Sequence, residues 1–573
     1  MRESQAEFPD RPCRPPTLSP GVPCTTRDSR GRSYESSVAV RLTFSRNRPT
    51  PSMDPPAQPW SIDSWRQKPI AQAITYPPET LPKLENVKAK LKQLPGLVTP
   101  HEIIKLKERL KLVARGEAFL LHGGDCAELF EYCNHEHISA RVKLLLMMSL
   151  IIIWGARIPV VRVGRIAGQF AKPRSQPTET IDGKEYPSFR GDIVNGYSLA
   201  ERTPDPERLL SAYFHSSAII NHIRGLLASG LANLQQPSAW SFAHVRSPSL
   251  QAKFQDIVER LEDSLDFMRT IGANAQSEGT LGILDTVEIW TSHEALLLEY
   301  EEALTRTVQP ARSVRARKIS SMAAGSAPSI KETAAPQSTA PSSKNPNSSH
   351  ESHSPSYDLS AHLVWVGERT RQLDHAHLEF LRGIANPVGV KLGPKTTPEE
   401  LIGILDILNP SYEEGKILLI CRFGANHVER CLPACIKAVQ NSKHHSSIFC
   451  CDPMHGNTKT AEGVSGIKTR YLSDVVTELS KSIQIHAENG SRLSGVHLEM
   501  TGELDEEGYS VTECLGGSMN LQTQHLSLNY QTHCDPRLNY EQSLDIAFLI
   551  ANQFQGLRDN PIIKQESILP DLN

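Results

Sequence analysis

The sequence lacks a surplus of charge of either sign, a long apolar segment and closely paired cysteines. Its 573 residues carry 61 Lys and Arg against 64 Asp and Glu, a formal net charge of −3. This balance argues against nucleic acid as the main partner, because neutralising phosphates requires a basic surplus. The longest apolar run, Leu144 to Trp154, falls short of the ~17–25 residues of a membrane span. We therefore expect a buried helix there and no membrane-spanning segment.

The eleven cysteines are scattered, odd in number and never spaced as Cys-x-x-Cys. This usage favours an intracellular, reduced protein in which a special cysteine acts as a metal ligand or nucleophile. The N-terminus also lacks the apolar core of a signal peptide. Residues 1–56 are rich in Arg, Pro and Ser without a hydrophobic period, which predicts a disordered tail. The main expectation is a cytoplasmic protein; organellar targeting by this tail, or a true start at Met53, are the alternatives.

A second compositional break covers residues 308–356, which are rich in Ser, Pro and Ala and contain no aromatic residue. Such a segment cannot bury enough apolar surface to order itself. We interpret it as a disordered insert within a single catalytic domain that spans residues 57–570, because related motifs lie on both sides of it. No repeat of fixed period is visible.

Short apolar runs that end in Gly and charged residues recur between these segments, and helix-like stretches follow most of them. The eight runs are "AFLLHGGDC", "IPVVRVGRI", "TVEIWTSHEA", "HLVWVGERT", "VGVKLGP", "ILLICRFGA", "SIFCCDPMHG" and "GVHLEMTGE". Eight strands alternating with helices are typical of a (β/α)8 barrel. A doubly wound open sheet is the alternative, but no Gly-x-Gly-x-x-Gly follows the first run. We therefore expect an α/β fold: a (β/α)8 TIM barrel with an N-terminal extension and peripheral helical insertions.

Charged and metal-binding residue types gather where these runs end. They are Cys126, Arg165, Glu368, Arg369, Lys391, Arg422, His455 and Glu499. The C-terminal ends of barrel strands carry the active site. Several cations at one mouth repel each other unless an anion is bound, so the sequence predicts a substrate with phosphate and carboxylate groups. The motif "AKPRS" adds Lys172, Arg174 and Ser175, which suit a second phosphate.

A metal site is predicted from one cysteine, one histidine and two carboxylates: Cys126, His455, Glu499 and Asp535. This donor set suits Mn, Co, Fe or Zn. The spacing is long-range, so purely structural roles stay open. Other donors lie nearby in the sequence: Cys133, Cys450, Cys451, Asp452, His497 and Cys534. His497 alternates with Glu499 along one run, so both are expected on the same face of a strand.

A set of long motifs in a fixed order carries a family resemblance. The motifs are "GGDCAE" (123–128), "RIAGQFAKPRS" (165–175), "SHEALLLEYEEALTR" (292–306), "GERTRQLD" (367–374), "FLRGIANPVGVKLGP" (380–394), "CDPMHGNT" (451–458), "VTECLGG" (511–517) and "THCDPRLN" (532–539). Together they closely resemble class II 3-deoxy-D-arabino-heptulosonate 7-phosphate (DAHP) synthase of the plant and microbial type. The resemblance runs from about Trp60 to Ala551, interrupted by the insert.

The resemblance implies condensation of phosphoenolpyruvate with D-erythrose 4-phosphate and water to DAHP and phosphate. That reaction is the first step of the shikimate pathway to chorismate and the aromatic amino acids. It also implies a metal-dependent homo-oligomeric barrel, with Mn²⁺ as the expected metal and Co²⁺, Zn²⁺ or Fe²⁺ as alternatives.

The resemblance also assigns roles to residues, motif by motif. The metal ligands fall on Cys126, His455, Glu499 and Asp535. The phosphoenolpyruvate contacts fall on Arg165, Glu368, Arg369, Lys391 and Arg422. The erythrose 4-phosphate contacts fall on Lys172, Arg174, Ser175 and Arg369. Catalytic roles are expected for Lys391 as a proton donor and for Glu368 or Glu499 in positioning water.

Three positions depart from the family pattern. His122 stands where Gln is usual, Phe423 where Met is usual, and His375 where Gly is usual. They leave open an amino-sugar variant of the same condensation. A metal-dependent barrel hydrolase is a further alternative, although the first strand lacks its His-x-His. A catalytically dead regulatory barrel would have lost a ligand or a cation, and none is missing.

Overall fold

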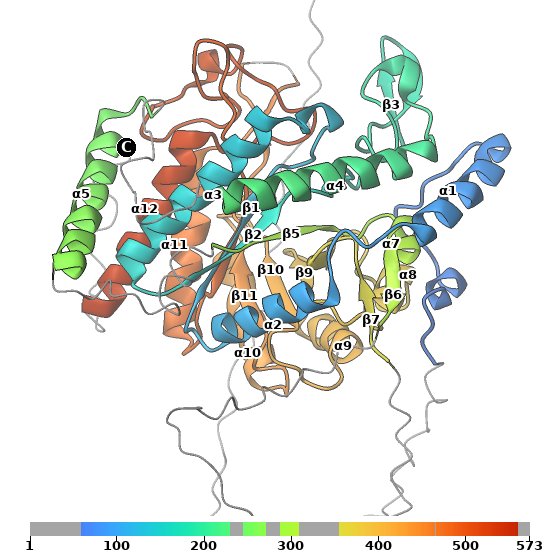
Figure 1. Ribbon diagram of the computed structural model, residues 1–573, viewed down its shortest axis with the longest axis horizontal. Helices are drawn as coiled ribbons and strands as arrows, with labels where there is room; N and C mark the ends of the chain where they lie inside the picture. The colour runs from blue at the N-terminus through green and yellow to red at the C-terminus, as the bar shows by residue number, and fades with distance from the viewer. Residues whose placement is uncertain (1–58, 230–244, 271–286, 309–353, 464–465, 560–573) are drawn as a thin grey trace, which may run out of the picture. The chain divides into compact units, whose positions relative to one another are not determined.

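The computed structural model describes residues 59–229, 245–270, 287–308, 354–463 and 466–559 (Figure 1). The chain divides into two units, Met1–Pro59 and Trp60–Asn573, and the description concerns the second. The tail expected at residues 1–56 lies outside the described residues, as does most of the insert expected at 308–356. Their disorder, and the domain boundaries drawn from it, stay predictions.

Eight parallel strands close into a barrel in the spatial order β1-β14-β11-β10-β9-β8-β5-β2. They are β1 (Phe119–Gly124), β2 (Val160–Arg165), β5 (Ile289–Glu294), β8 (Leu363–Val366), β9 (Val388–Leu392), β10 (Ile417–Cys421), β11 (Ile448–Cys451) and β14 (Gly495–Glu499). Each of the predicted apolar runs contains one of these strands, so the barrel prediction is confirmed. The runs are apolar because a parallel barrel buries both faces of every strand.

Helices enclose the barrel, and Figure 1 shows them around the strands. They are α1 (Leu81–Gln93), α3 (His135–Ala156), α4 (Glu207–Ala228), α5 (Pro248–Thr270), α7 (Leu298–Leu304), α8 (Ala376–Leu381), α9 (Pro398–Leu408), α10 (Val428–Gln440), α11 (Leu472–Glu488) and α12 (Tyr540–Asp559). Single 3-10 turns lie at η1 (Ser64–Gln67), η2 (Pro78–Thr80), η3 (Phe130–Tyr132), η4 (Leu199–Glu201) and η6 (Thr523–His525). The helices after β9, β10 and β11 pack side by side, α9 against α10 and α10 against α11.

Helix α3 corrects one expectation from the sequence. By length and composition alone it could cross a membrane, although its unbroken apolar run is short. However, 78% of its most apolar window is buried inside the protein. It packs along α12, and Arg141 within it pairs with the buried carboxylate of Asp125 at 2.7 Å. The prediction of a buried helix is confirmed, whereas the expectation that no segment is long and apolar enough for a span is wrong.

Helix α2 (Pro100–Ala114) closes the N-terminal end of the barrel. A capping box starts it: the Thr99 hydroxyl accepts from the backbone N–H of Glu102, whose carboxylate accepts from the N–H of Thr99. The apolar side of the helix, with Leu106 and Leu110, joins one buried cluster with the side chains that fill this end of the barrel. That end is therefore a packed core rather than a pore.

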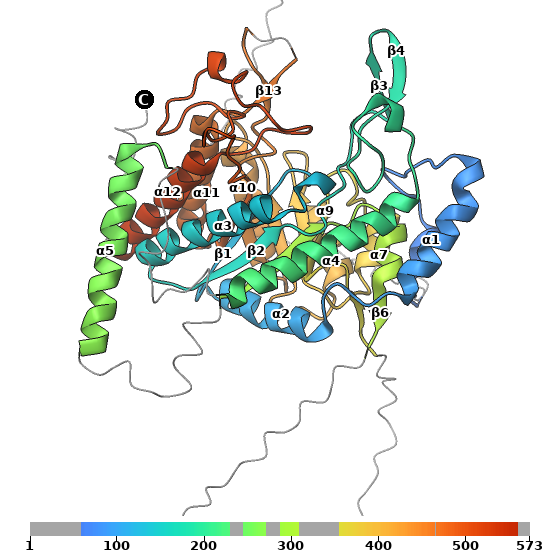
Figure 2. The same ribbon diagram turned by 45° about the horizontal axis from the view of Figure 1, so that its top comes forward.

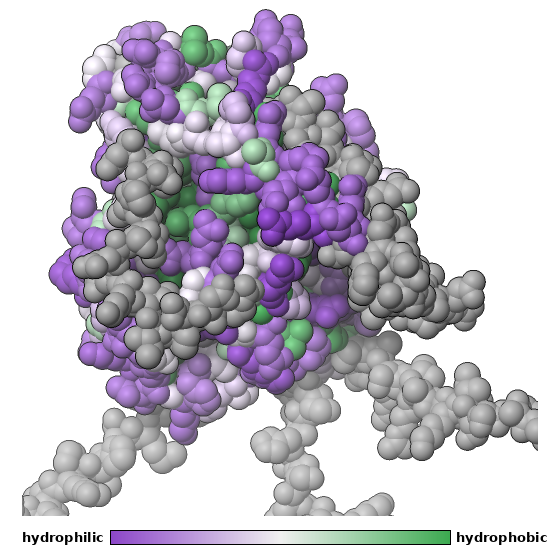
Figure 3. All heavy atoms as spheres, turned by 90° about the vertical axis from the view of Figure 1, so that its left-hand side faces the viewer, coloured by the Kyte–Doolittle hydropathy of each residue, from purple (hydrophilic) through white to green (hydrophobic). Residues whose placement is uncertain are grey.

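Long loops extend from the opposite end of the barrel. In Figure 2 the segments that follow β2, β11 and β14 all lie on one side, away from α2. The first carries a hairpin of β3 (Thr178–Ile181) and β4 (Lys184–Pro187), and the second pairs β12 (Lys459–Thr460) with β13 (Lys468–Thr469). Strands β6 (Thr305–Thr307) and β7 (Ser356–Asp358) pair on either side of the insert. The α5 side of the surface is mostly polar, with apolar side chains visible among the polar ones (Figure 3).

Candidate active site

One cavity of ≈ 490 Å³ opens at the C-terminal end of the barrel. Every residue that the sequence proposed for the site lines it: Cys126, Arg165, Lys172, Arg174, Ser175, Glu368, Arg369, Lys391, Arg422, His455, Glu499 and Asp535. They come from strand ends or from the loops just after them, which barrel closure brings to one mouth. Residues more than 300 positions apart in the sequence thus become neighbours.

The proposed metal ligands meet at one side of this cavity. The Sγ of Cys126 and carboxylate oxygens of Glu499 and Asp535 all lie within 4.8 Å of one another. The Nε2 of His455 is 2.9 Å from Oε1 of Glu499. Pairing of β1 with β14 accounts for part of this convergence, because Gly124 and Glu499 are register partners and Cys126 follows two residues later.

Lys172 provides a test of whether this donor set fits a cation. Its ammonium lies 2.8 Å from Sγ of Cys126 and forms an ion pair with Asp535. Burial opposes the charge of Lys172, but Asp535, Cys126 and Glu499 together with Cys534 outweigh it, so the pKa of the lysine is raised. The thiol and the two carboxylates therefore already face a positive charge. The residues fit a divalent transition metal, for which this donor set is suited.

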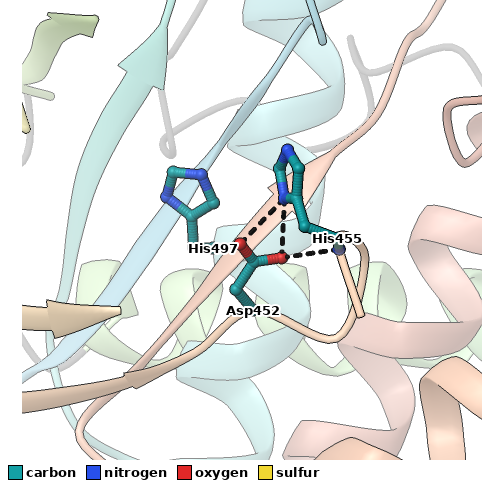
Figure 4. Close-up of side chains that lie close together, drawn as sticks. All are labelled: Asp452, His455 and His497. Carbon is teal, nitrogen blue, oxygen red and sulfur yellow. Dashed lines mark hydrogen bonds and ion pairs between the residues drawn. The ribbon is translucent and has the colours of Figure 1, made fainter. Parts of the chain in front are cut away.

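Asp452 contacts His455 twice and so orients its ring (Figure 4). Its carboxylate lies 2.8 Å from Nδ1 of the histidine and accepts from the backbone N–H of the same residue at 3.2 Å. The Nε2 atom is thereby left facing Glu499. Asp452, His455 and His497 also form a close donor group, but Asp452 pairs with Lys391 and His497 with Arg165. The carboxylate–histidine pair is the arrangement that orients metal-binding imidazoles in proteins.

Three cations lie deep in the cavity. Arg165 is 2% exposed and donates from Nε to the carbonyl of Asp125 at 2.8 Å and from Nη2 to Oε1 of Glu499 at 3.0 Å. The Nζ of Lys391 is 2.5 Å from Oδ2 of Asp452. Burial lowers the pKa of Lys391, and Asp452 opposes that shift. Arg422 donates to the carbonyl of His455, while its buried Nε has no hydrogen-bond partner within the described part of the chain.

A second group of polar side chains lies nearer the solvent. Arg369 donates to the hydroxyl of Ser175 at 3.1 Å, which links the loop after β8 to the loop after β2. Arg174 pairs with Glu179 at 3.1 Å. Glu368 accepts from a neighbouring arginine with Oε1, whereas no described residue bonds its buried Oε2. The cavity thus has a deep basic region and a separate outer one, which suits two anionic ligands.

Comparison with known proteins agrees with this geometry. The class-II DAHP synthetase family matches residues 60–551. The chain belongs to this family. The match covers the whole barrel and both loops that carry the proposed metal ligands after β11 and β14. The family assignment predicted from the motifs is confirmed.

Three curated relatives each carry the name phospho-2-dehydro-3-deoxyheptonate aldolase. The Neurospora crassa protein is 49% identical over 505 residues, which cover 88% of this chain and 96% of the relative. The Streptomyces coelicolor protein is 40% identical, over 87% of this chain and 98% of the relative. The Mycolicibacterium smegmatis protein is 39% identical, over 87% of this chain and 97% of the relative.

Sequence reasoning missed several charged groups at this site, of which Arg470 and Glu294 are two. Arg470, which is fully buried, lies 2.8 Å from Oε2 of Glu499. Burial raises the pKa of Glu499, but His455 and Arg470 outweigh it, and the pKa is well below its usual range. Arg470 follows β13 within a long loop, so no strand end marks it. Glu294 also lines the cavity; it ends β5, and the strand-end pattern could have identified it.

Proposed function

We propose that the protein condenses phosphoenolpyruvate with D-erythrose 4-phosphate and water to give DAHP and phosphate. The observation that carries this proposal is the meeting of four proposed metal donors with a deep and an outer basic region in one cavity. Membership of the class-II DAHP synthetase family supports it over residues 60–551. No observation favours a hydrolase, a dead barrel or an amino-sugar synthase.

Phosphoenolpyruvate is assigned to the deep region. Arg165, Lys391 and Arg422 together offer a rigid set of donors to its phosphate and carboxylate groups. The unpartnered Nε of Arg422 leaves one of these donors available. We assign Glu368 and Arg369, which line the same cavity, to the boundary between the two substrates.

Erythrose 4-phosphate is assigned to the outer region. Its phosphate would meet Arg174, Ser175 and Arg369, and Lys172 would lie nearer the aldehyde. The contact between Arg369 and Ser175 brings the two loops together, which supports the assignment of one phosphate to this region. Holding both substrates in one orientation supplies much of the rate enhancement of a two-substrate condensation.

Cys126, His455, Glu499 and Asp535 would hold the metal, for which we propose Mn²⁺, with Co²⁺, Zn²⁺ or Fe²⁺ as alternatives. A bound divalent cation supplies Lewis-acid polarisation of a carbonyl oxygen. Asp452 would keep Nε2 of His455 directed at this site, as its two contacts with that residue indicate.

The bond changes follow from this arrangement. C3 of phosphoenolpyruvate bonds to the aldehyde carbon, and the aldehyde oxygen takes a proton. We assign that proton to Lys391, because its lowered pKa favours proton donation near neutral pH. Water then adds to the electron-poor C2 and releases one proton, which replaces the proton that Lys391 gave up. Glu368 is assigned to orient this water, since no described residue bonds its buried Oε2. Breaking the bond between C2 and the phosphate oxygen releases phosphate, which takes up the remaining hydroxyl proton, and leaves the ketone.

A phosphate-release assay tests the proposal. Metal-stripped protein is supplied with both substrates, then with each substrate alone, before and after re-addition of Mn²⁺. We expect phosphate release only with both substrates and the metal. Replacing erythrose 4-phosphate by its imino analogue separates the amino-sugar variant, and release from phosphoenolpyruvate alone would identify a hydrolase instead.

We also propose a cytoplasmic homo-oligomer with small phosphorylated molecules as its ligands. The near-neutral charge supports small molecules rather than nucleic acid as ligands, and the nine described cysteines, which form no disulfide with one another, support a reducing compartment. The homo-oligomer is proposed from the family resemblance. Light scattering of the purified chain measures the oligomer size, and imaging of the chain with and without residues 1–56 tests the alternative of organellar targeting.

A further inference from the structure

A chain of hydrogen bonds crosses the barrel interior directly beneath the cavity. Nη1 of Arg165 lies 2.6 Å from Nε2 of His497, and Nδ1 of His497 lies 3.0 Å from Nδ1 of His122. Nε2 of His122 is 2.8 Å from the hydroxyl of Ser292, which donates to the carbonyl of Gly164 at 2.8 Å. This series of hydrogen bonds therefore starts on strand β2, passes through β14, β1 and β5, and returns to β2.

The chemistry of the donors gives this chain a single direction. A guanidinium can only donate, so Nε2 of His497 must accept and carries no proton. The proton of that ring is then on Nδ1 and is donated to Nδ1 of His122. The proton of His122 is consequently on Nε2, where it is donated to Ser292. Each bond thus fixes the tautomer required by the next, and both rings are neutral.

The packing around the two rings agrees with this assignment. His122 and His497 are fully buried. Their ring centroids lie 4.3 Å apart, and Trp365 packs edge-on against both, at 5.4 and 5.3 Å. Burial, followed by the nearby charge of Arg165, holds the pKa of His122 well below its usual value. The rings cannot rotate without losing these contacts, so they form a rigid support.

We propose that His122 and His497 are positioning residues, which hold the Arg165 guanidinium in the orientation that binds phosphoenolpyruvate. Arg165 donates to fixed acceptors at three other points, the Asp125 and Cys126 carbonyls and Glu499. His497 provides the contact from below, and His122 determines which nitrogen of His497 can accept. This inference rests on the proposed function, because it assigns Arg165 to phosphoenolpyruvate.

Two substitutions of His122 test the chain. His122→Leu removes both hydrogen bonds, whereas His122→Gln keeps one acceptor and one donor on a side chain of similar reach. We expect the leucine variant to raise both the KM and the calorimetric Kd for phosphoenolpyruvate about tenfold. His497 would no longer be held in the tautomer that accepts from the Arg165 guanidinium, and a hydrogen bond to a charged group has this size. The KM for erythrose 4-phosphate should change less than about twofold. The glutamine variant should restore phosphoenolpyruvate binding to near the original value.

His362→Leu is the matched control. His362 is also a buried histidine of the barrel, but its Nδ1 accepts from the backbone N–H of Thr291 and it does not line the cavity. We expect this variant to lose stability without changing the Kd for phosphoenolpyruvate. Any of three results would overturn the proposal. The Kd for phosphoenolpyruvate could be equal in the wild type and His122→Leu, it could rise equally in the leucine and glutamine variants, or it could rise as much in His362→Leu. Failure of the wild type itself to bind phosphoenolpyruvate would overturn the proposed function together with it.

Discussion

The two ends of the barrel interior are built on opposite principles. At the N-terminal end, α2 packs on a buried cluster of mostly aliphatic side chains with Trp290, and this cluster continues along the barrel interior to Trp365 at the cavity. At the C-terminal end, arginines, lysines and carboxylates meet in an open cavity, and buried atoms such as Oε2 of Glu368 and Nε of Arg422 have no hydrogen-bond partner among the described residues. Unpartnered buried polar atoms destabilise a fold. The comparison indicates that one end stabilises the barrel and the other binds ligands at a cost in stability.

The sharpest test of this division is one substitution made at both ends. Lys391→Met removes a cation of the cavity. We expect turnover to fall about 1,000-fold or more, because charge stabilisation and proton donation are both lost. Lys416→Met removes a buried lysine just before β10, whose Nζ donates to the carbonyls of Ile384 and Asn386. It should change stability while leaving turnover per folded molecule within about twofold. Steady-state kinetics with both substrates measure this, and a wild-type rate in Lys391→Met contradicts the role of that residue.

Cys126→Ser is expected to have the next largest effect. Serine is a poor ligand for a transition metal, so metal affinity and turnover should each fall by at least about 100-fold while the fold is kept. Metal content after dialysis against a chelator, together with circular dichroism, provides the measurement.

Cys435→Ser is the control for that variant, because Cys435 is equally buried but lies in α10, where it packs in an apolar cluster. The Cys435→Ser variant should retain the bound metal after the same dialysis. Full, EDTA-sensitive turnover in Cys126→Ser would show that the ligand assignment is wrong.

The contrast between the ends also separates what the sequence predicts from what it does not. The eight strands were identifiable because an apolar run that ends in Gly and charge is a local pattern. The strand-end residues of the site followed from the same pattern. Arg165 and Lys391 could therefore be named before any coordinates, and the cavity contains both.

Cross-strand contacts could not be predicted in this way. The bond between His497 and His122 joins residues 375 positions apart and depends on the register of β1 against β14. Arg470 reaches Glu499 from an irregular loop. The membrane-length property of α3 was missed because the prediction counted only the run from Leu144 to Trp154, whereas the helix begins at His135 and continues through Arg141 and Lys143.

At the stabilising end, Leu110→Ala should cost about 4 kcal/mol of unfolding free energy. The side chain is fully buried between α2 and the barrel, and removing it leaves a cavity in a packed core. Denaturant unfolding measures the loss, with Leu81→Ala at an exposed position of α1 as the control. Turnover per folded molecule should be unchanged. A large rise in the KM of either substrate would show that the two ends are coupled more tightly than the comparison assumes.

The smallest expected effect concerns pH and again lies at the apolar end. Burial lowers the pKa of His362 from 6.5 to about 4. Its unprotonated Nδ1 accepts from the backbone N–H of Thr291. Below pH 6.5 the unfolded chain takes up a proton at this residue and the folded one does not, so stability is lost as the pH falls from 6.5 towards 4. The loss of unfolding free energy should be at most about 3 kcal/mol.

His362→Leu removes this contribution, so the difference in unfolding free energy between wild type and variant should shrink as the pH is lowered from 7 to 4.5. A difference that stays constant over this range would mean that His362 is protonated in the fold or exposed to water, and that the N-terminal end is less dry than its apolar cluster indicates.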